Sequence, residues 1–334
     1  MQPIAEALSR VRLGEPVQFR NLTVFPLFGR SSGAPGYLLL GDALEQKLAH
    51  VTEVSESGAV PELLFVNDAA EKVLLVDGEE LVGARQNRIL NVTLLVGGKQ
   101  KVVIPVSCVE QGRWAWKSRH FASADRALFA KARAKKAWQV NASLRESGSR
   151  YANQAEIWSD ISAKAACLRV QSSTQAMADI YEQQSAQLED YVKAFRPQPG
   201  QAGAVFAING RVTGVELFDS DATFRKFMEK LVRSYTMDAI EEASPEANPP
   251  VEESVRRFLD DMKSAPVQRF PALAEGEDLR IESDAVVGGA LYAENRLVHL
   301  CAFQVEKPVG RPIGRGGTID FDIPASPRRS SRRM

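Results

Sequence analysis

The sequence has few of the residues that most often carry metal, redox or nucleophilic chemistry. It contains three cysteines and three histidines among 334 residues. The cysteines are odd in number, far apart and form no CxxC pair, so we predict no disulfide framework and expect a reducing compartment. The histidines are never at metal-ligand spacing, which argues against a structural zinc site. These residues are Cys108, Cys167, Cys301, His50, His120 and His299.

Long hydrophobic runs and an excess of one charge are also missing. No stretch approaches the roughly 18 consecutive apolar residues of a membrane span, and the first residues, which include Glu6, lack the apolar core of a signal peptide. We therefore expect a cytoplasmic protein without a membrane partner. Lysine plus arginine equals aspartate plus glutamate, 42 each. This balance argues against a dedicated nucleic-acid coat, because such proteins bind largely through cationic charge.

The remaining composition is that of a globular protein, with 44% hydrophobic and 25% charged residues. Short apolar runs and turn residues predict a β-rich part over 15–116. Residues 122–196 are rich in Ala and Gln and predict long helices, and 203–305 alternate strands with helices. We expect one α+β domain over 1–306, with long inserted helices and the later strands completing the sheet. The Arg-rich residues 307–334 predict a flexible tail.

Turn and capping signals place several individual elements. Two β-branched runs, 91–96 and 101–106, flank Gly97-Gly98 and predict a hairpin. The pair Asn209-Gly210 predicts another hairpin of type I′. Helices are expected from 123 to about 144 and from 153 to about 195. Asn153 and Glu156 have the spacing of a capping box at the start of the second helix.

Charge is unevenly distributed within the neutral total. Residues 111–150 hold ten basic side chains against two acids, Asp125 and Glu146, whereas 238–261 are rich in acids. One interpretation is two solvated helix faces that pair with each other. The other is a cationic wall that attracts a phosphate-bearing ligand or RNA. The basic residues are Arg113, Lys117, Arg119, Arg126, Lys131, Arg133, Lys135, Lys136, Arg145 and Arg150.

The densest polar segment runs from Asp77 to Asn91. It contains Glu79 and Glu80 between two glycine turns, followed by Arg85, Gln86, Asn87 and Arg88. Guanidinium and amide groups at the entrance of a strand suit the recognition of a phosphorylated or polyoxygenated molecule. The competing interpretation is structural, with Asn side chains capping turns and Arg88 paired with Glu80.

A second polar segment, from Pro105 to Trp114, follows the predicted hairpin. If its strands pair, Gln86–Arg88 lie near Cys108–Arg113, and Glu80 and Glu110 face one pocket with Arg88, Arg113 and Gln111. Two carboxylates can divide acid and base roles in glycosidic hydrolysis. They could equally hold Mg²⁺ together with a phosphate.

Cys108, Trp114 and Trp116 each allow a structural and a functional interpretation. Cys108 as a nucleophile would need a general base, for which His120 is the candidate nearby in sequence; a small buried hydrophobe is the alternative. Trp114 and Trp116 would stack on a base or sugar, or else pack in the core. The sequence contains no Walker A, GxSxG or HExxH motif.

Three strings stand out together: Phe19-Arg-Asn-Leu-Thr-Val-Phe-Pro-Leu27, Glu79-Glu-Leu-Val-Gly-Ala-Arg-Gln-Asn-Arg-Ile-Leu-Asn91 and Ile104-Pro-Val-Ser-Cys-Val-Glu-Gln-Gly-Arg-Trp114. They resemble a prokaryotic domain family named for its association with ADP-ribosylglycohydrolase and the rhodanese–phosphatase superfamily. The resemblance covers most of 15–305. It implies genomic company with enzymes that handle ADP-ribose or phosphate esters. The family-like polar positions are Glu80, Gln86, Asn87, Arg88, Glu110, Gln111 and Arg113.

Three functions are consistent with these observations. The first is an enzyme that acts on a nucleotide-derived, ADP-ribose-type ligand, a hydrolase of a glycosidic or phosphate-ester bond. Glu80 and Glu110 would be its acid/base or metal-holding groups, Arg88 and Arg113 its phosphate ligands, and Gln86 and Asn87 would orient ribose or base. The second is a non-catalytic sensor of the same ligand.

The third function is an interaction scaffold in which the polar motif is structural, with assembly into a homo-oligomer left open. The geometry of the site distinguishes these functions. An enzyme requires both carboxylates and an arginine in one open cleft with room for water. A scaffold requires an Arg88 whose donors are all bound by Glu80 and backbone carbonyls, with no cavity beside them. A sheet that buries the motif away from solvent would argue against the enzyme and the sensor.

Overall fold

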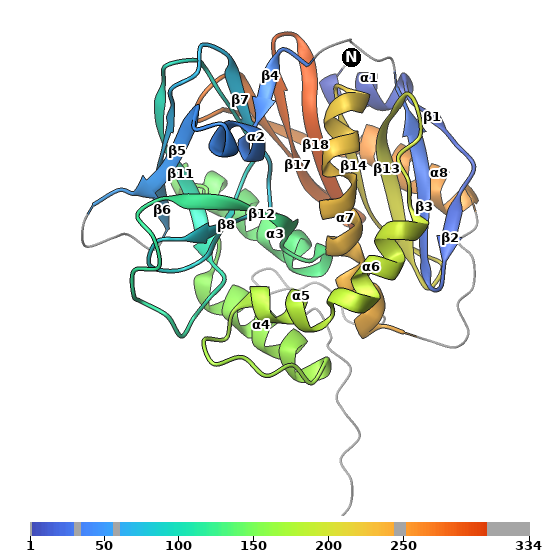
Figure 1. Ribbon diagram of the computed structural model, residues 1–334. Helices are drawn as coiled ribbons and strands as arrows, with labels where there is room; N and C mark the ends of the chain where they lie inside the picture. Colours follow the sequence, from blue (N-terminus) through green and yellow to red (C-terminus); the bar gives the residue numbers. More distant parts are fainter. Residues whose placement is uncertain (1, 30–34, 56–60, 244–251, 306–334) are drawn as a thin grey trace, which may run out of the picture.

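The computed structural model describes residues 2–29, 35–55, 61–243 and 252–305. It is an α+β fold built on a nine-stranded sheet beside a smaller, curved six-stranded sheet (Figure 1). The predicted tail from 307 lies outside the described residues. No helix in the described ranges is both long enough and apolar enough to cross a membrane.

The nine-stranded sheet joins the first strands of the chain to the last. Its order is β1-β3-β13-β14-β18-β17-β16-β15, with β2 also paired to β3. The contact between β3 and β13 confirms that the later strands complete the earlier sheet. The strands are β1 (Arg12–Leu13), β2 (Val17–Phe19), β3 (Leu22–Phe28), β13 (Gln201–Ile208), β14 (Arg211–Phe218), β15 (Val267–Pro271), β16 (Glu277–Glu282), β17 (Val286–Ala293) and β18 (Arg296–Gln304).

Helices cover both faces of this sheet, which explains why every residue of β13 is buried. One face packs on α3 (Ala130–Ser147), α6 (Ser185–Ala194) and α7 (Asp221–Glu241). The other face packs on α1 (Pro3–Ser9) and α8 (Glu252–Ser264). Figure 1 shows α7 crossing in front of the sheet. The predicted Asn209-Gly210 hairpin is confirmed, with φ values of 50° and 78° at the two turn residues.

The six-stranded sheet curls into a partly closed barrel. Its order is β12-β8-β9-β11-β6-β5, and the two edge strands approach each other, with the His50 and His120 rings 5.8 Å apart. Apolar side chains such as Leu63, Phe65 and Ile104 fill its interior. The strands are β5 (Ala49–Glu53), β6 (Glu62–Asn67), β8 (Glu79–Gly83), β9 (Arg88–Leu90), β11 (Lys101–Cys108) and β12 (Phe121–Ala127).

A three-stranded sheet and a short helix connect the barrel to the larger sheet. The order is β10-β7-β4, with β4 (Tyr37–Leu39), β7 (Lys72–Leu75), β10 (Leu94–Val96) and α2 (Leu40–Glu45). The predicted hairpin across Gly97-Gly98 is therefore wrong, because β10 pairs with β7 while β11 pairs with β6 and β9. The glycines allow a close approach of backbones instead: a Cβ on Gly98 would lie 2.1 Å from the Ala70 carbonyl oxygen.

The helical part differs from the prediction in two places. Residues 121–127 form β12, an edge strand paired with β8, so the first long helix begins only at Ala130. The second predicted helix is divided into α4 (Gln154–Cys167), α5 (Met177–Gln183) and α6. Its predicted start is confirmed, since the Asn153 side chain accepts hydrogen bonds from the Ala155 and Glu156 N–H groups.

Candidate functional site

The two polar segments meet at one end of the barrel. Arg88 is opposite Cys108 in the antiparallel register of β9 and β11. This register places Gln86 and Asn87 beside Glu110: Gln86 Nε2 donates to the Glu110 carbonyl at 2.9 Å, and Val109 N donates to the Asn87 carbonyl at 3.0 Å. The prediction that Gln86–Arg88 lie near Cys108–Arg113 is therefore correct, although it was based on a hairpin that does not form.

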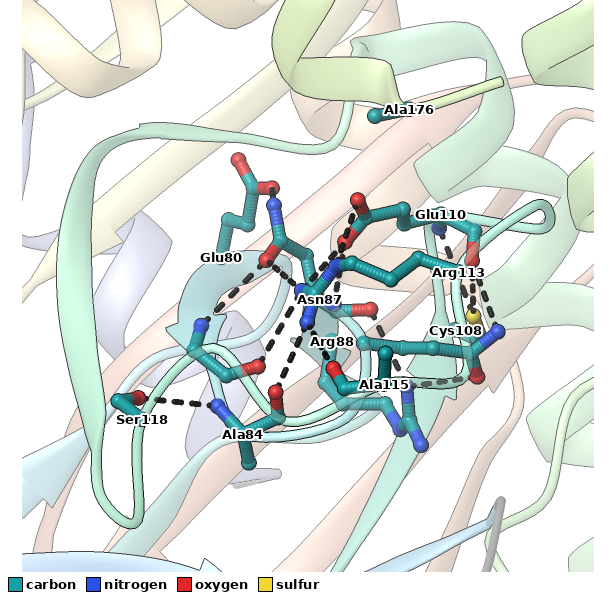
Figure 2. A network of polar contacts seen from close by, with 12 residues as sticks. Glu80, Ala84, Asn87, Arg88, Cys108, Glu110, Arg113, Ala115, Ser118 and Ala176 are labelled. Atoms are coloured by element: carbon teal, nitrogen blue, oxygen red, sulfur yellow. Dashed lines mark hydrogen bonds and ion pairs between the residues drawn. The ribbon is translucent and has the colours of Figure 1, made fainter. Parts of the chain in front are cut away.

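Asn87 links the two predicted carboxylates. Its Nδ2 donates to Glu80 Oε1 at 3.1 Å, and its backbone N–H donates to Glu110 Oε2 at 3.1 Å (Figure 2). Glu80 and Glu110 are both buried, with 0% and 6% of their surface exposed. Glu80 also accepts from Arg126, not from Arg88 as the structural interpretation supposed. Each carboxylate is thus held by an amide and a guanidinium.

Arg113 fastens the segment after β11 to the turn between β8 and β9. Its Nη2 lies 2.6 Å from Glu110 Oε2, and its Nε donates to Oε1 at 2.9 Å. Its Nη1 donates to the carbonyls of Ala84 and Ala115, both at 2.8 Å, and its Nη2 reaches Asn87 Oδ1 at 3.2 Å. Figure 2 shows these bonds converging on one guanidinium. Arg113 therefore acts as a clamp at the end of the barrel.

The environments of the two carboxylates shift their pKa values in opposite directions. Burial raises the pKa of Glu80, and the nearby Arg126 and Asn87 only partly offset this effect. Burial also acts to raise the pKa of Glu110, but the hydrogen bonds from Arg113 and Asn87 and the charge of Arg113 hold it below its usual range. A pair of carboxyl groups whose pKa values diverge is the arrangement in which one acts as acid and the other as base.

Arg88 is fully buried, and two of its three guanidinium nitrogens have no hydrogen-bond partner among the described residues. Its Nη1 donates to Gln86 Oε1 at 3.1 Å and to the Asn87 carbonyl at 3.4 Å. Its Nε and Nη2 have no hydrogen-bond partner among the described residues. Burial lowers the pKa of Arg88. Since unpaired buried donors cost free energy, the incomplete hydrogen bonding of Arg88 calls for an explanation.

Glu53, at the end of β5, is a site residue that the sequence reasoning missed. It is 7% exposed, and neither of its carboxylate oxygens has a hydrogen-bond partner within the described part of the chain. The negative charge of Glu53 acts to raise the pKa of Arg88. A sequence signal did exist: Ala49, Val51 and Glu53 alternate on the buried face of their strand, and an acid in that phase is unusual.

Two tryptophans form an exposed surface above this end of the barrel. Trp114 is 45% and Trp116 is 49% exposed, and the Arg85 guanidinium lies 5.5 Å and 4.7 Å from their ring centroids. The Trp114 ring also lies over Arg88, 5.8 Å from the centroid to Cζ. Lys117 and Arg119 are exposed on the same segment. The packing of these indoles into the core, one of the two alternatives, is wrong.

The remaining predicted residues play smaller parts. Gln111 is exposed and makes no hydrogen bond to another described residue. Cys108 is buried, and burial raises the pKa of its thiol, which donates to the Glu110 carbonyl at 3.3 Å. His120 contacts His50, on the opposite edge strand. These features favour the small-hydrophobe interpretation of Cys108.

The basic stretch is largely neutralised within the protein. Lys131 pairs with Glu241 and Glu242 of the acidic stretch, so the two oppositely charged segments do contact each other. Arg133 and Lys136 are not on a solvated face: both are 0% exposed. Lys117 and Arg119 are the two cations of this stretch that form no ion pair with another described residue. The paired ones are Arg113, Arg126, Lys131, Arg133, Lys135, Lys136, Arg145 and Arg150.

Two cavities in the described structure lie beside the site rather than on it. A cleft of about 690 Å³ is lined by Glu79, Ser123, Lys226 and Lys230 among others, and a cavity of about 190 Å³ by Arg126, Tyr181 and Arg233 among others. Neither is lined by Glu80, Glu110 or Arg88. No three His, Cys, Asp or Glu side chains of the described residues converge as metal ligands, and Glu80 and Glu110 both face guanidinium groups.

The chain was compared with protein-family models, curated proteins and solved structures. Residues 10–303 match the family model described as ARG and Rhodanese-Phosphatase-superfamily-associated Protein domain. No curated protein and no solved structure matches. The matched region contains the whole polar cluster, the barrel and the nine-stranded sheet, apart from the last residue of β18. The helix α1 lies before the matched region.

Proposed function

Because the chain belongs to the family of ARG and Rhodanese-Phosphatase-superfamily-associated Protein domains, we propose that it binds a nucleotide-derived, phosphate-bearing ligand of the ADP-ribose type. The ligand occupies the end of the barrel, above Arg88. The observation that carries this proposal is the pair of half-exposed indoles, Trp114 and Trp116, with the Arg85 guanidinium close to both rings.

An exposed aromatic pair flanked by cations suits a nucleotide for two reasons. Every base offers a flat face that stacks on an aromatic ring, at about 1–3 kcal/mol per base. Lys117 and Arg119, which are exposed and form no ion pair with a described residue, supply charge for phosphate groups. Large exposed aromatic side chains are otherwise costly on a surface, which favours a partner for them.

The predicted site residues take supporting roles in this proposal. The side chains of Gln86 and Asn87 are occupied by Arg88, Glu110, Glu80 and Arg113, so they position groups of the protein rather than ribose. Glu110 and Arg113 hold the segment that carries the tryptophans. Arg88, with two donors unpaired, is the member of the cluster that is left to contact ligand.

Calorimetric titration with ADP-ribose, AMP and ribose 5-phosphate, with and without Mg²⁺, tests the proposal. Trp116→Ala should weaken the binding of ADP-ribose and AMP about tenfold, the loss expected for one stacked base. Leu273→Ala, which removes another exposed apolar side chain from a different surface, is the matched control and should bind like the wild type. Failure of all three compounds to bind would rule out this ligand class.

A second candidate function is hydrolysis of the same ligand, although both carboxylates are buried and neither described cavity is the open cleft that an enzyme requires. It is favoured by one observation, the opposite pKa shifts of Glu80 and Glu110 around Asn87. A raised pKa suits Glu80 as the acid, and a lowered pKa suits Glu110 as the base. Glu110→Gln should then abolish turnover of ADP-ribose while binding persists. Unchanged ADP-ribose after prolonged incubation with the wild type would leave the binding function alone.

A further inference from the structure

Two side chains on the inner face of the barrel, Arg88 and Glu53, each carry a hydrogen-bonding edge without a partner among the described residues. On Arg88 the unpaired groups are Nε and Nη2, whose N–H bonds lie side by side on one edge of the guanidinium. The other nitrogen, Nη1, carries both of the bonds that the side chain makes. The unused part of Arg88 is therefore a complete two-donor fork, and 0% of the residue is exposed to water.

Glu53 presents the complementary edge, two acceptor oxygens without partners among the described residues. The strand registers place it on the same face as Arg88. Glu53 is opposite Leu63, Leu63 is opposite Ile104, and Ile104 is four residues before Cys108, which is opposite Arg88. Residues an even number apart on a strand share a face, so both charged side chains point into the barrel.

The charges and the hydrogen-bonding groups of the two side chains together limit what can bind to both. One buried cation and one buried anion sum to zero, so a neutral group is favoured over an added phosphate. The guanidinium edge requires two adjacent acceptors, and the carboxylate requires two adjacent donors. A vicinal diol meets both requirements, because each hydroxyl donates one hydrogen bond and accepts others.

We propose that Arg88 and Glu53 bind the cis-diol of a pentose. The Glu53 carboxylate accepts from the two hydroxyl groups, and the Nε–H and Nη2–H of Arg88 donate to the same two oxygens. This inference rests on the proposed function and assigns the ribose of the ligand to the end of the barrel, against the side chains of Arg88 and Glu53. Trp114 covers Arg88 in the structure, so the ribose enters as the half-exposed indole swings aside.

A comparison of ligands that differ by one hydroxyl tests the inference without any substitution. The pairs are AMP against 2′-deoxy-AMP, and ribose 5-phosphate against 2-deoxyribose 5-phosphate, each titrated into the full chain by calorimetry. The deoxy compounds should bind at least about tenfold more weakly, because a site built for a hydroxyl leaves buried groups unpaired without it. Tryptophan fluorescence should change more with the ribose compounds, since Trp114 moves.

Variants then assign the discrimination to its residues. Glu53→Gln keeps the shape but replaces one acceptor oxygen by a donor, and should reduce the preference for AMP over 2′-deoxy-AMP to less than about threefold. Arg88→Gln should do the same. Glu71→Gln, at an exposed position between β6 and β7, is the matched control and should keep the wild-type preference for AMP over 2′-deoxy-AMP. Circular dichroism and the thermal midpoint verify that each variant folds.

The outcomes separate this inference from the proposed function. Equal affinity for the ribose and deoxyribose compounds would overturn the assignment of the diol but leave the nucleotide-binding function standing. Binding of none of the four compounds would overturn both. A preference for ribose that survives in Glu53→Gln and Arg88→Gln would place the diol elsewhere and overturn the inference as well.

Discussion

Arg133 on α3 and Glu216 on β14 form an ion pair in the interior of the protein, with Nη1 and Oε1 2.6 Å apart and both side chains fully buried. The pair fastens α3, which also packs on the barrel, to the nine-stranded sheet. It belongs to a larger group: Arg133 also contacts Asp77, Asp77 contacts Lys136, and His299 lies 3.2 Å from the second oxygen of Glu216. These contacts join elements from both sheets.

Removing one partner of this pair should strongly destabilise the fold. Glu216→Gln leaves a buried guanidinium with only Asp77 for compensation, and the expected loss is about 3–5 kcal/mol in the free energy of unfolding. Urea unfolding followed by circular dichroism measures it. Glu253→Gln, which breaks the exposed ion pair with Arg257, is the control and should change little. A Glu216 variant as stable as this control would contradict the assigned role.

The same group predicts how stability depends on pH. Burial acts to raise the pKa of Asp77, but the charges of Lys136 and Arg133 hold it below its ordinary value of 3.8. Burial acts in the same way on Glu216, where Arg133 and His299 hold the pKa below its ordinary value of 4.5. A carboxyl group with a lowered pKa stabilises the fold fully above its ordinary value. That contribution is lost as the pH falls through the lowered value.

Stability should therefore decrease below about pH 4.5, and Glu216→Gln should make the decrease shallower. Glu80 acts in the opposite direction, because burial raises its pKa and its folded form binds a proton more readily. Urea unfolding at a series of pH values measures the slope. An identical acid slope in the wild type and in Glu216→Gln would show that Glu216 does not supply this dependence.

How much of this could be read from the sequence depends on the range of the interactions. Local signals were reliable: Asn153 caps its helix, and Asn209-Gly210 forms its hairpin. Contacts between segments that are distant in the sequence could not be predicted from it. The break between α4 and α5 has no Pro or Gly, and it arises where Thr174 and Ala176 contact Gly112 and Glu110 in the site segment.

The candidate site shows the same division. The strings around Glu80 and Glu110 placed the polar cluster correctly, because its members are close in sequence to two adjacent strands. The partners of the carboxylates were unpredictable: Arg126 reaches Glu80 from an edge strand that was expected to be helical. Glu53 is three strands away from Arg88 in the sheet, and only the closure of the barrel brings the two to one interior.

Arg113 provides a prediction about mobility. Lysine keeps the charge but cannot donate at once to Glu110, Ala84 and Ala115, so Arg113→Lys should release the segment 109–120. Hydrogen exchange of its backbone amides, measured by mass spectrometry, should become faster there and unchanged in α7. Arg119→Lys, an exposed position on the same segment, is the control. Equal exchange in both variants would mean that the clamp does not hold the segment.

The turn at Asp77-Gly78 gives the last prediction, because it separates backbone strain from a steric collision. Gly78 has φ +83°, and a Cβ there would lie 2.8 Å from Arg133 Nε. Gly36 has φ +73°, and no atom of the described residues lies within 4 Å of its Cβ position. Gly36→Ala should therefore cost only the strain of a left-handed residue, about 1–2 kcal/mol. Gly78→Ala should cost clearly more by urea unfolding, since Arg133 must shift away from Asp77 and Glu216. Equal costs would show that Arg133 adapts freely, and would weaken the case that this buried ion pair fixes the two sheets.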